Sequence, residues 1–173
     1  MTGRNRFYDT YTHTLAYGEV CVFISHQKRD AGAARKIADY LTTAGIDVYF
    51  DEWDKSIDRS NPNSVVAAIQ KGLDRSSHLL VLLSSNALAS TWVPWEVGYG
   101  YHKNVFGLTL KELARNTLPE YLQVIPIVRG TKSLNDYLSK LTGVGVESMI
   151  RDSRLTMYYN SYHPLREILD QTL

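Results

Sequence analysis

Short apolar runs alternate along the chain with segments in which apolar residues recur at helical spacing. Five of these runs have the length of buried strands: residues 20–24, 46–50, 78–83, 105–108 and 124–128. Strands that alternate with helices are typical of a parallel sheet with crossover connections. The run 78–83 is the most uniformly apolar, as expected for a strand covered on both faces, whereas Pro126 removes a ladder donor and places the fifth strand at an edge.

The segments between these runs predict helices and one long loop. Apolar side chains between residues 33 and 44 follow helical spacing, and Gly45 suits the left-handed residue that ends a helix. A second helix is expected from about Ser64, with Asn63 or Ser64 as its N-cap. Before it lies a long polar loop, residues 51–63. Further helices are expected over residues 111–122, 134–141 and 164–173.

This order of elements predicts a flavodoxin-like, doubly wound α/β fold. Right-handed crossovers leave few topologies, and we expect a parallel five-stranded sheet of order 2-1-3-4-5. Such sheets bind ligands where the strand order reverses, which here is between the first and third strands. The loops 25–30 and 84–95 leave the sheet at this point, so we expect hydroxyls, the basic pair at 28 and 29 and two tryptophans to line a crevice that Glu96 faces.

Length and composition fit one domain. The 173 residues, 44% of them hydrophobic, can bury a substantial core. We expect residues 1–18 to form an N-terminal extension and residues 19–173 to form a single domain. Cys21 lies in an apolar run and has no second cysteine to pair with, so we expect a small buried side chain and no disulfide.

Charge and hydropathy bear on the partners and the location of the protein. Nineteen basic and eighteen acidic residues leave a formal charge of +1, so no overall charge attracts nucleic acid or an anionic membrane. The longest apolar run, residues 79–83, is far too short to span a bilayer. We therefore expect a soluble, cytoplasmic protein with no nucleic-acid or membrane partner.

Several chemistries that such sheets support lack their residues here. A Walker loop needs Gly followed directly by Lys, but residues 130–133 read Gly-Thr-Lys-Ser. The stretch 25–32, which would carry a dinucleotide fingerprint, has one glycine, and a Gly-x-Ser-x-Gly nucleophile elbow is absent. The five histidines and one cysteine have no zinc spacing, so no metal site is expected.

Residues 91–98, which read Thr-Trp-Val-Pro-Trp-Glu-Val-Gly, carry the most informative pattern for function. With Pro94 as the first helical residue, Glu96 is expected in the first turn, where backbone N–H groups favour the ionised carboxylate. Glutamate is also common at this position simply because it suits a helix start. A carboxylate beside Trp92 suits a flat, cationic leaving group on a sugar. We expect either Trp92 or Trp95 to be an ordinary core residue.

Five segments, in order, resemble the signature segments of a TIR domain. They are Phe-Ile-Ser-His at 23–26, Gly-Ile-Asp-Val-Tyr-Phe-Asp at 45–51, Ile-Gln-Lys-Gly-Leu-Asp-Arg-Ser at 69–76, Leu-Leu-Ser at 82–84 and Trp-Val-Pro-Trp-Glu at 92–96. The resemblance is strongest over residues 20–101. The Trp-x-x-x-Glu pattern resembles the enzymatic branch of the family, whose members cleave NAD+ between nicotinamide and ribose.

The resemblance implies roles for particular residues. Glu96 matches the catalytic glutamate, and Trp92 would line the nicotinamide pocket. Ser25 and His26 would begin the loop that contacts the dinucleotide. Where the family often has an aromatic residue and arginines after the serine, this chain has His-Gln-Lys-Arg at 26–29, so adenine stacking is left open while positive charge near the pyrophosphate is kept.

The resemblance also implies that the loop 51–63 mediates self-association. Asp51 begins this loop, and Trp53 is an aromatic residue in a polar stretch, so we expect Trp53 to contact a neighbouring subunit or the substrate. Ser84, at the end of the third strand, is a further candidate for substrate binding, although a serine there can also bond only to local backbone.

The chemistry of this cleavage needs only one carboxylate. Nicotinamide leaves a cationic precursor as a neutral molecule, so no general acid is required, unlike ordinary glycoside hydrolysis. An ionised Glu96 would stabilise the positive charge that develops on the ribose. NAD+ is then the substrate, and no cofactor is expected. The product is ADP-ribose, or a cyclic form if an internal atom such as an adenine nitrogen captures the ribosyl cation.

Two other functions fit the same residues. One is a non-enzymatic TIR adaptor that acts by homotypic assembly, and the other is a nucleoside deoxyribosyltransferase-like enzyme that prefers nucleosides to NAD+. The chain also resembles the stand-alone TIR proteins of Thoeris-type bacterial antiphage systems. That resemblance implies a nucleotide signal and a separate effector protein that receives it.

Overall fold

The computed structural model describes residues 1–8, 15, 18–50, 61–113 and 118–171. Five parallel strands form one sheet in the order β2-β1-β3-β4-β5, which confirms the predicted fold and strand order. The strands are β1 (Cys21–Ser25), β2 (Asp47–Tyr49), β3 (His78–Leu83), β4 (Asn104–Thr109) and β5 (Ile127–Arg129). The fifth strand begins three residues later than expected, and it occupies the edge that Pro126 predicts.

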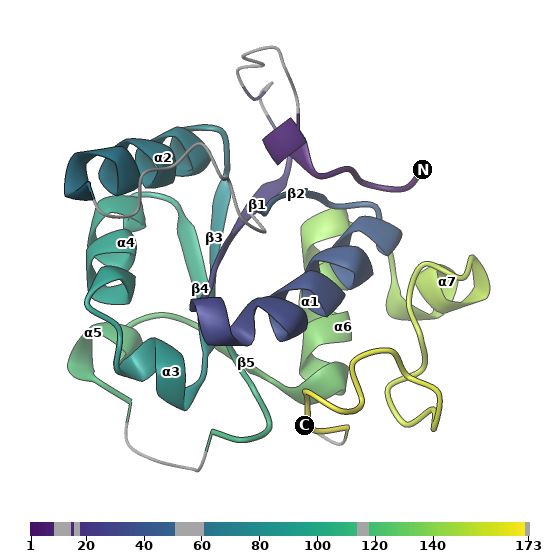
Figure 1. Cartoon of the computed structure of the whole chain (residues 1–173). Helices are drawn as coiled ribbons and strands as arrows, with labels where there is room; N and C mark the ends of the chain where they lie inside the picture. Colours follow the sequence, from purple (N-terminus) through teal and green to yellow (C-terminus); the bar gives the residue numbers. More distant parts are fainter. Residues whose placement is uncertain (9–14, 16–17, 51–60, 114–117, 172–173) are drawn as a thin grey trace.

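Helices cover both faces of the sheet (Figure 1). One face carries α1 (Ala31–Thr43), α6 (Gly130–Thr142) and α7 (Val146–Arg151), and the other carries α2 (Pro62–Asp74), α3 (Ser85–Leu88), α4 (Trp92–Gly100) and α5 (Glu120–Gln123). Side chains alternate between the two layers along β1: Val22 and Ile24 face α1, whereas Cys21 and Phe23 face the layer of α4. Cys21 is fully buried, as expected.

The ends of α1 and α2 follow local sequence signals. Gly45, just beyond α1, has a φ of +91°, which confirms its predicted left-handed conformation. The second helix begins earlier than expected, because Pro62 takes the first helical position and Asn61 is the N-cap, with its side chain accepting a hydrogen bond from the Asn63 amide at 3.0 Å. Neither Asn63 nor Ser64 is therefore the cap.

The helix expected over residues 164–173 is wrong. The described part of this segment, which ends at residue 171, forms successive turns. Two of its carbonyl groups accept hydrogen bonds from elsewhere in the chain: Ile168 from the Lys111 amide at 2.8 Å, and Asp170 from the Thr131 amide at 2.7 Å. Leu165 and Leu169 are fully buried, so burial and these tertiary bonds replace a regular helix.

Of the other two helices expected in the second half of the chain, one is confirmed and the other is much shorter than expected. Over residues 134–141 the prediction is confirmed by α6, which begins four residues earlier, at Gly130. Over residues 111–122 only α5 is helical among the described residues, and it begins after Pro119. A residue that precedes proline is disfavoured in helical conformation, which accounts for this late start.

Residues near the N-terminus lie along the outer edge of β2. The Val48 amide donates to the Arg4 carbonyl at 2.9 Å, and the buried Arg6 guanidinium lies 2.6 Å from an Asp47 carboxylate oxygen. The Asn5 amide group bonds both backbone groups of Phe50, accepting from its N–H at 3.1 Å and donating to its carbonyl at 2.9 Å. These contacts cover an edge strand that would otherwise expose unpaired backbone.

Two glycines in the helices of the α4 layer provide a matched test of this packing. A Cβ on Gly72 of α2 would lie 2.4 Å from a ring carbon of Phe23 and 2.8 Å from one of Tyr49, whereas a Cβ on Gly98 of α4 would meet nothing within 4 Å. We expect Gly72→Ala to destabilise the fold by about 1–3 kcal/mol through overpacking. Gly98→Ala should stabilise it by up to about 1 kcal/mol through helix propensity. Urea unfolding measures both, and equal effects would contradict the packing.

Candidate active site

A carboxylate takes a core-facing position of α4. The buried residues of this helix are Val93, Glu96, Val97 and Gly100, which follow the spacing of an inward-facing stripe. Glu96 is 9% exposed and lies among apolar neighbours of the same layer. A carboxylate at such a position loses hydration and needs a polar partner.

Ser25 provides that partner. It is 2% exposed and ends β1, beside Val81 of β3, with its side chain on the same face of the sheet as Phe23. Its hydroxyl donates a hydrogen bond to Oε2 of Glu96. The structure therefore brings two of the sequence-predicted site residues into contact at the carboxyl end of β1, which is the switch point of the sheet.

Glu96 lies deeper in its helix than expected. The helix begins at Trp92, so Pro94 is its third residue and Glu96 its fifth, beyond the first turn. The Ser90 hydroxyl accepts hydrogen bonds from the amides of Trp92 at 3.1 Å and Val93 at 3.3 Å, which satisfies two N–H groups at the helix start. The expected start at Pro94 is therefore wrong: Thr91 is the N-cap, and Ser90, which was not considered, holds the first two helical amides.

The protonation of Glu96 also differs from expectation. Burial raises the pKa of Glu96 from 4.5 to about 7, and the hydrogen bond from Ser25 opposes this rise because it stabilises the carboxylate. We expected the free N–H groups of the first helical turn to keep Glu96 ionised. This expectation is wrong, because Glu96 lies beyond the first turn of α4. Near neutral pH both the neutral and the ionised form of Glu96 are therefore populated.

Aromatic side chains extend from this site along α4. Trp92 and Trp95 contact each other edge to face with ring centroids 6.3 Å apart, and Trp95 stacks on Tyr99 at 5.3 Å. Both tryptophans are half-buried and neither belongs to the core clusters, so the expectation that one is an ordinary core residue is wrong. Trp92 stands one helical turn before Glu96, on a similar side of the helix.

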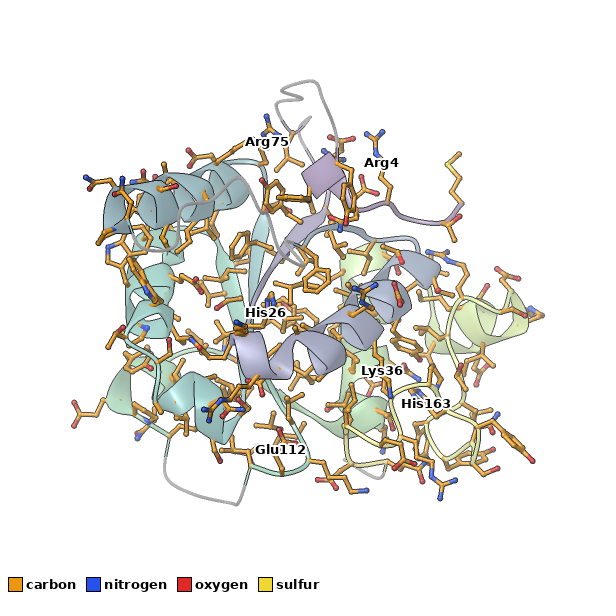
Figure 2. The ribbon with its side chains drawn as sticks, viewed as in Figure 1. Arg4, His26, Lys36, Arg75, Glu112 and His163 are labelled. Carbon is orange, nitrogen blue, oxygen red and sulfur yellow. The ribbon has the colours of Figure 1, made fainter. Side chains whose placement is uncertain are left out.

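His26 faces away from α4. Its ring Nδ1–H donates to the Ile24 carbonyl at 3.2 Å, and the ring lies 5.1 Å from that of Phe50, at the end of β2. Figure 2 labels it where β1 passes into α1, near the centre of the molecule. His26 therefore stands at the switch point, but on the opposite side of the loop from Ser25.

Ser84 is fully buried, and its side chain makes one local and one long-range hydrogen bond. Its hydroxyl donates to Oδ2 of Asp30 at 2.5 Å and accepts from the Ala87 amide at 3.0 Å, which caps α3. Ser84 therefore forms a hydrogen bond to the β1–α1 loop rather than to Glu96. The two remaining candidates, Asp51 and Trp53, lie outside the described residues.

Sequence reasoning missed four polar residues of the site, which are Gln27, Asp30, Asn86 and Ser90. Asp30 is buried and accepts from Asn86 Nδ2 at 2.7 Å as well as from Ser84. Gln27 donates through Nε2 to the Ser90 hydroxyl. The available signals were an aspartate shortly before a predicted helix and a serine directly before Thr-Trp. Neither signal shows that the loop after β1 bonds to the loop before α4.

Metal ligands and membrane spans were also considered. Within the described ranges, no group of three or more His, Cys, Asp or Glu side chains is arranged to hold a metal ion. In the same part of the chain, every helix is too short or too polar to cross a bilayer.

Comparison with known proteins identifies the family. Residues 22–141, well over half of the chain, match a family model described as TIR domain. The chain belongs to the TIR-domain family. Its Ser25–Glu96 contact thus lies inside the matched TIR domain, whereas the turns that follow α7 lie outside it.

A curated relative of this TIR protein comes from Bacillus cereus (strain MSX-D12) and is named "Probable 3' cyclic ADP-D-ribose synthase ThsB'". The two chains are 35% identical over 81 residues, which cover 45% of this chain and 42% of the relative. The match therefore spans less than half the length of that relative.

The raised pKa of Glu96 predicts a pH-dependent stability. The unfolded chain releases this proton near pH 4.5 and the folded chain near pH 7, so the free energy of unfolding falls as the pH rises through this window. Glu96→Gln removes the titration. Its stability relative to wild type should increase by up to about 3 kcal/mol between pH 5 and pH 8.5.

Urea unfolding at both pH values measures this difference, and Glu112→Gln, which changes an exposed carboxyl, serves as the control. A stability difference between Glu96→Gln and wild type that is the same at pH 5 and pH 8.5 would contradict the raised pKa.

Proposed function

We propose that this TIR protein cleaves NAD+ at the bond between nicotinamide and ribose, with Glu96 as the catalytic residue. The observation that carries the proposal is a buried carboxylate that accepts a hydrogen bond from Ser25 at the switch point of a parallel sheet. A structural glutamate gains nothing from such burial, because an apolar side chain would fill the position at lower cost. Groups with strongly shifted pKa values at such points are typical of functional sites.

The chemistry follows from the environment of Glu96. As the bond to nicotinamide breaks, positive charge develops on the ribose, and a fixed carboxylate in an apolar layer stabilises that charge more strongly than one in water. The cationic nicotinamide ring of bound NAD+ favours the ionised form of Glu96, since opposite charges lower a carboxyl pKa. Trp92 offers an aromatic face to the same ring.

We further propose that the ribosyl cation is captured within the molecule, which gives a cyclic ADP-ribose-type product. The relative from B. cereus, which is named a probable cyclic ADP-ribose synthase, supports this choice over capture by water. A cyclic product fits a signal that is received by a separate effector protein, as the sequence resemblance to antiphage TIR proteins implies. The protein would act as an assembly of copies, with segment 51–63 as the expected contact.

The role of Glu96 has a direct test. Wild-type protein at high concentration should release nicotinamide from NAD+, and Glu96→Gln should slow the release by about a hundredfold or more, because it removes one preorganised charge. Chromatography of the reaction measures nicotinamide and separates linear from cyclic product.

Glu147→Gln, on the exposed face of α7, is the matched control and should keep wild-type turnover. Activity retained by Glu96→Gln would contradict the catalytic role. A wild type that releases no nicotinamide at any concentration would favour the adaptor, and cleavage of nucleosides alone would favour the deoxyribosyltransferase.

The proposed mechanism also predicts a pH profile. Because kcat/KM reports the free enzyme and the reaction needs ionised Glu96, kcat/KM should rise with pH through about 7 and then level off. Ser25→Ala removes the donor that stabilises the carboxylate, so the midpoint should move to higher pH. Steady-state rates from pH 5 to pH 9 measure both midpoints, and a profile that is flat below pH 7 would contradict the assignment.

A further inference from the structure

The segment after β1 sends alternate side chains in opposite directions. Gln27 has an extended backbone, with φ −84° and ψ 150°, so side chains two residues apart project to the same side. Ser25 and Gln27 both reach the α4 region, where Ser25 bonds Glu96 and Gln27 bonds Ser90. His26 lies between them and points the other way, to Phe50. Two residues of one short segment thus contact the α4 region at two separate points.

The contact made by Gln27 acts on the start of the helix. Its acceptor, the Ser90 hydroxyl, also holds the amides of Trp92 and Val93, which are the first two residues of α4. A displacement of Ser90 therefore displaces the first turn, which bears Trp92. At the other end of the helix, a Cβ on Gly100 would lie 2.7 Å from a Leu79 methyl carbon, so this end packs closely on β3.

The segment that makes these contacts is itself held in place. Asp30, three residues after Gln27, is buried and accepts hydrogen bonds from Ser84 and Asn86. The β1–α1 loop is thus tied to β3 and α3 at one end and is continuous with β1 at the other. It provides a fixed reference against which α4 can be aligned.

We propose that Gln27 is a positioning residue which, together with Ser25, clamps α4 at two points and so fixes Glu96 and Trp92 relative to the loop that receives the dinucleotide. This inference rests on the proposed function for its catalytic consequence. Small displacements of a catalytic group can cost about a hundredfold in rate, so loss of the Gln27 contact should lower turnover by displacing Glu96 and Trp92.

Kinetics of nicotinamide release test the catalytic consequence. Gln27→Ala should lower kcat by about tenfold with KM within about twofold, since misplacement of Glu96 weakens the transition state rather than substrate binding. Ser90→Ala should have an effect of at least this size, and Ser90→Thr, which keeps the hydroxyl, should restore most of the rate. The double variant should be no slower than Ser90→Ala, because both changes break one contact.

The matched control is Gln123→Ala. Gln123 is an exposed glutamine that donates through Nε2 to the Leu118 carbonyl at 2.6 Å, in the α5 region. Like Gln27 it donates through its side-chain amide, but it does so away from the switch point, and its removal should leave kcat unchanged.

Hydrogen exchange tests the clamp without any enzymatic activity. The amides of Trp92 and Val93 should exchange at least about tenfold faster in Gln27→Ala than in wild type and Gln123→Ala, because their acceptor, Ser90, is no longer held. Unchanged exchange at both amides would overturn the clamp, whether or not the protein cleaves NAD+.

The two proposals can therefore fail separately. Faster exchange together with unchanged kcat in Gln27→Ala would overturn the positioning role. Faster exchange in Gln27→Ala, together with a wild-type protein that releases no nicotinamide, would overturn the proposed function and the catalytic consequence of the clamp, while leaving the clamp itself supported. Additive losses in the double variant would show that Gln27 acts other than through Ser90, and would also overturn the proposal.

Discussion

A carboxyl group buried in an apolar layer is the constraint around which the switch point is built. Glu96 lies between Val93 and Val97 on the buried face of α4, at a position that suits a hydrophobic side chain. Its removal from water raises its pKa to about 7, and Ser25 opposes that rise. The fold tolerates this cost because the rest of the α4 layer is apolar and well packed, from Leu73 of α2 to Leu122 of α5.

The fold could be predicted because its signals are local and repeated. The run 78–83 becomes β3 with the bounds expected, and Gly45 ends α1 as its freedom at positive φ suggests. The failures lie where tertiary contacts replace local preference. The segment after residue 164 has the composition of a helix, but its carbonyls bond to Lys111 and Thr131, which are distant in sequence.

The site was predicted as a set of residues but not as an arrangement. Spacing and resemblance select Glu96 and Ser25, and strand topology places both at one edge of the sheet. The protonation of Glu96 could not be predicted, because it depends on how deeply α4 packs and on where the helix begins. The hydrogen bond between Gln27 and Ser90 joins two loops that are distant in the sequence, and the pattern of a single sequence does not predict such side-chain pairs.

The segment beside β2 bears on how copies of this protein can assemble. Arg4 and Asn5 occupy the backbone groups of Val48 and Phe50 that a neighbouring strand would need. Two copies cannot fuse their sheets into one continuous sheet through β2 unless these residues are first displaced. An assembly at the β2 edge that leaves them in place must join through side chains, and its geometry then follows from surface shape rather than from backbone pairing.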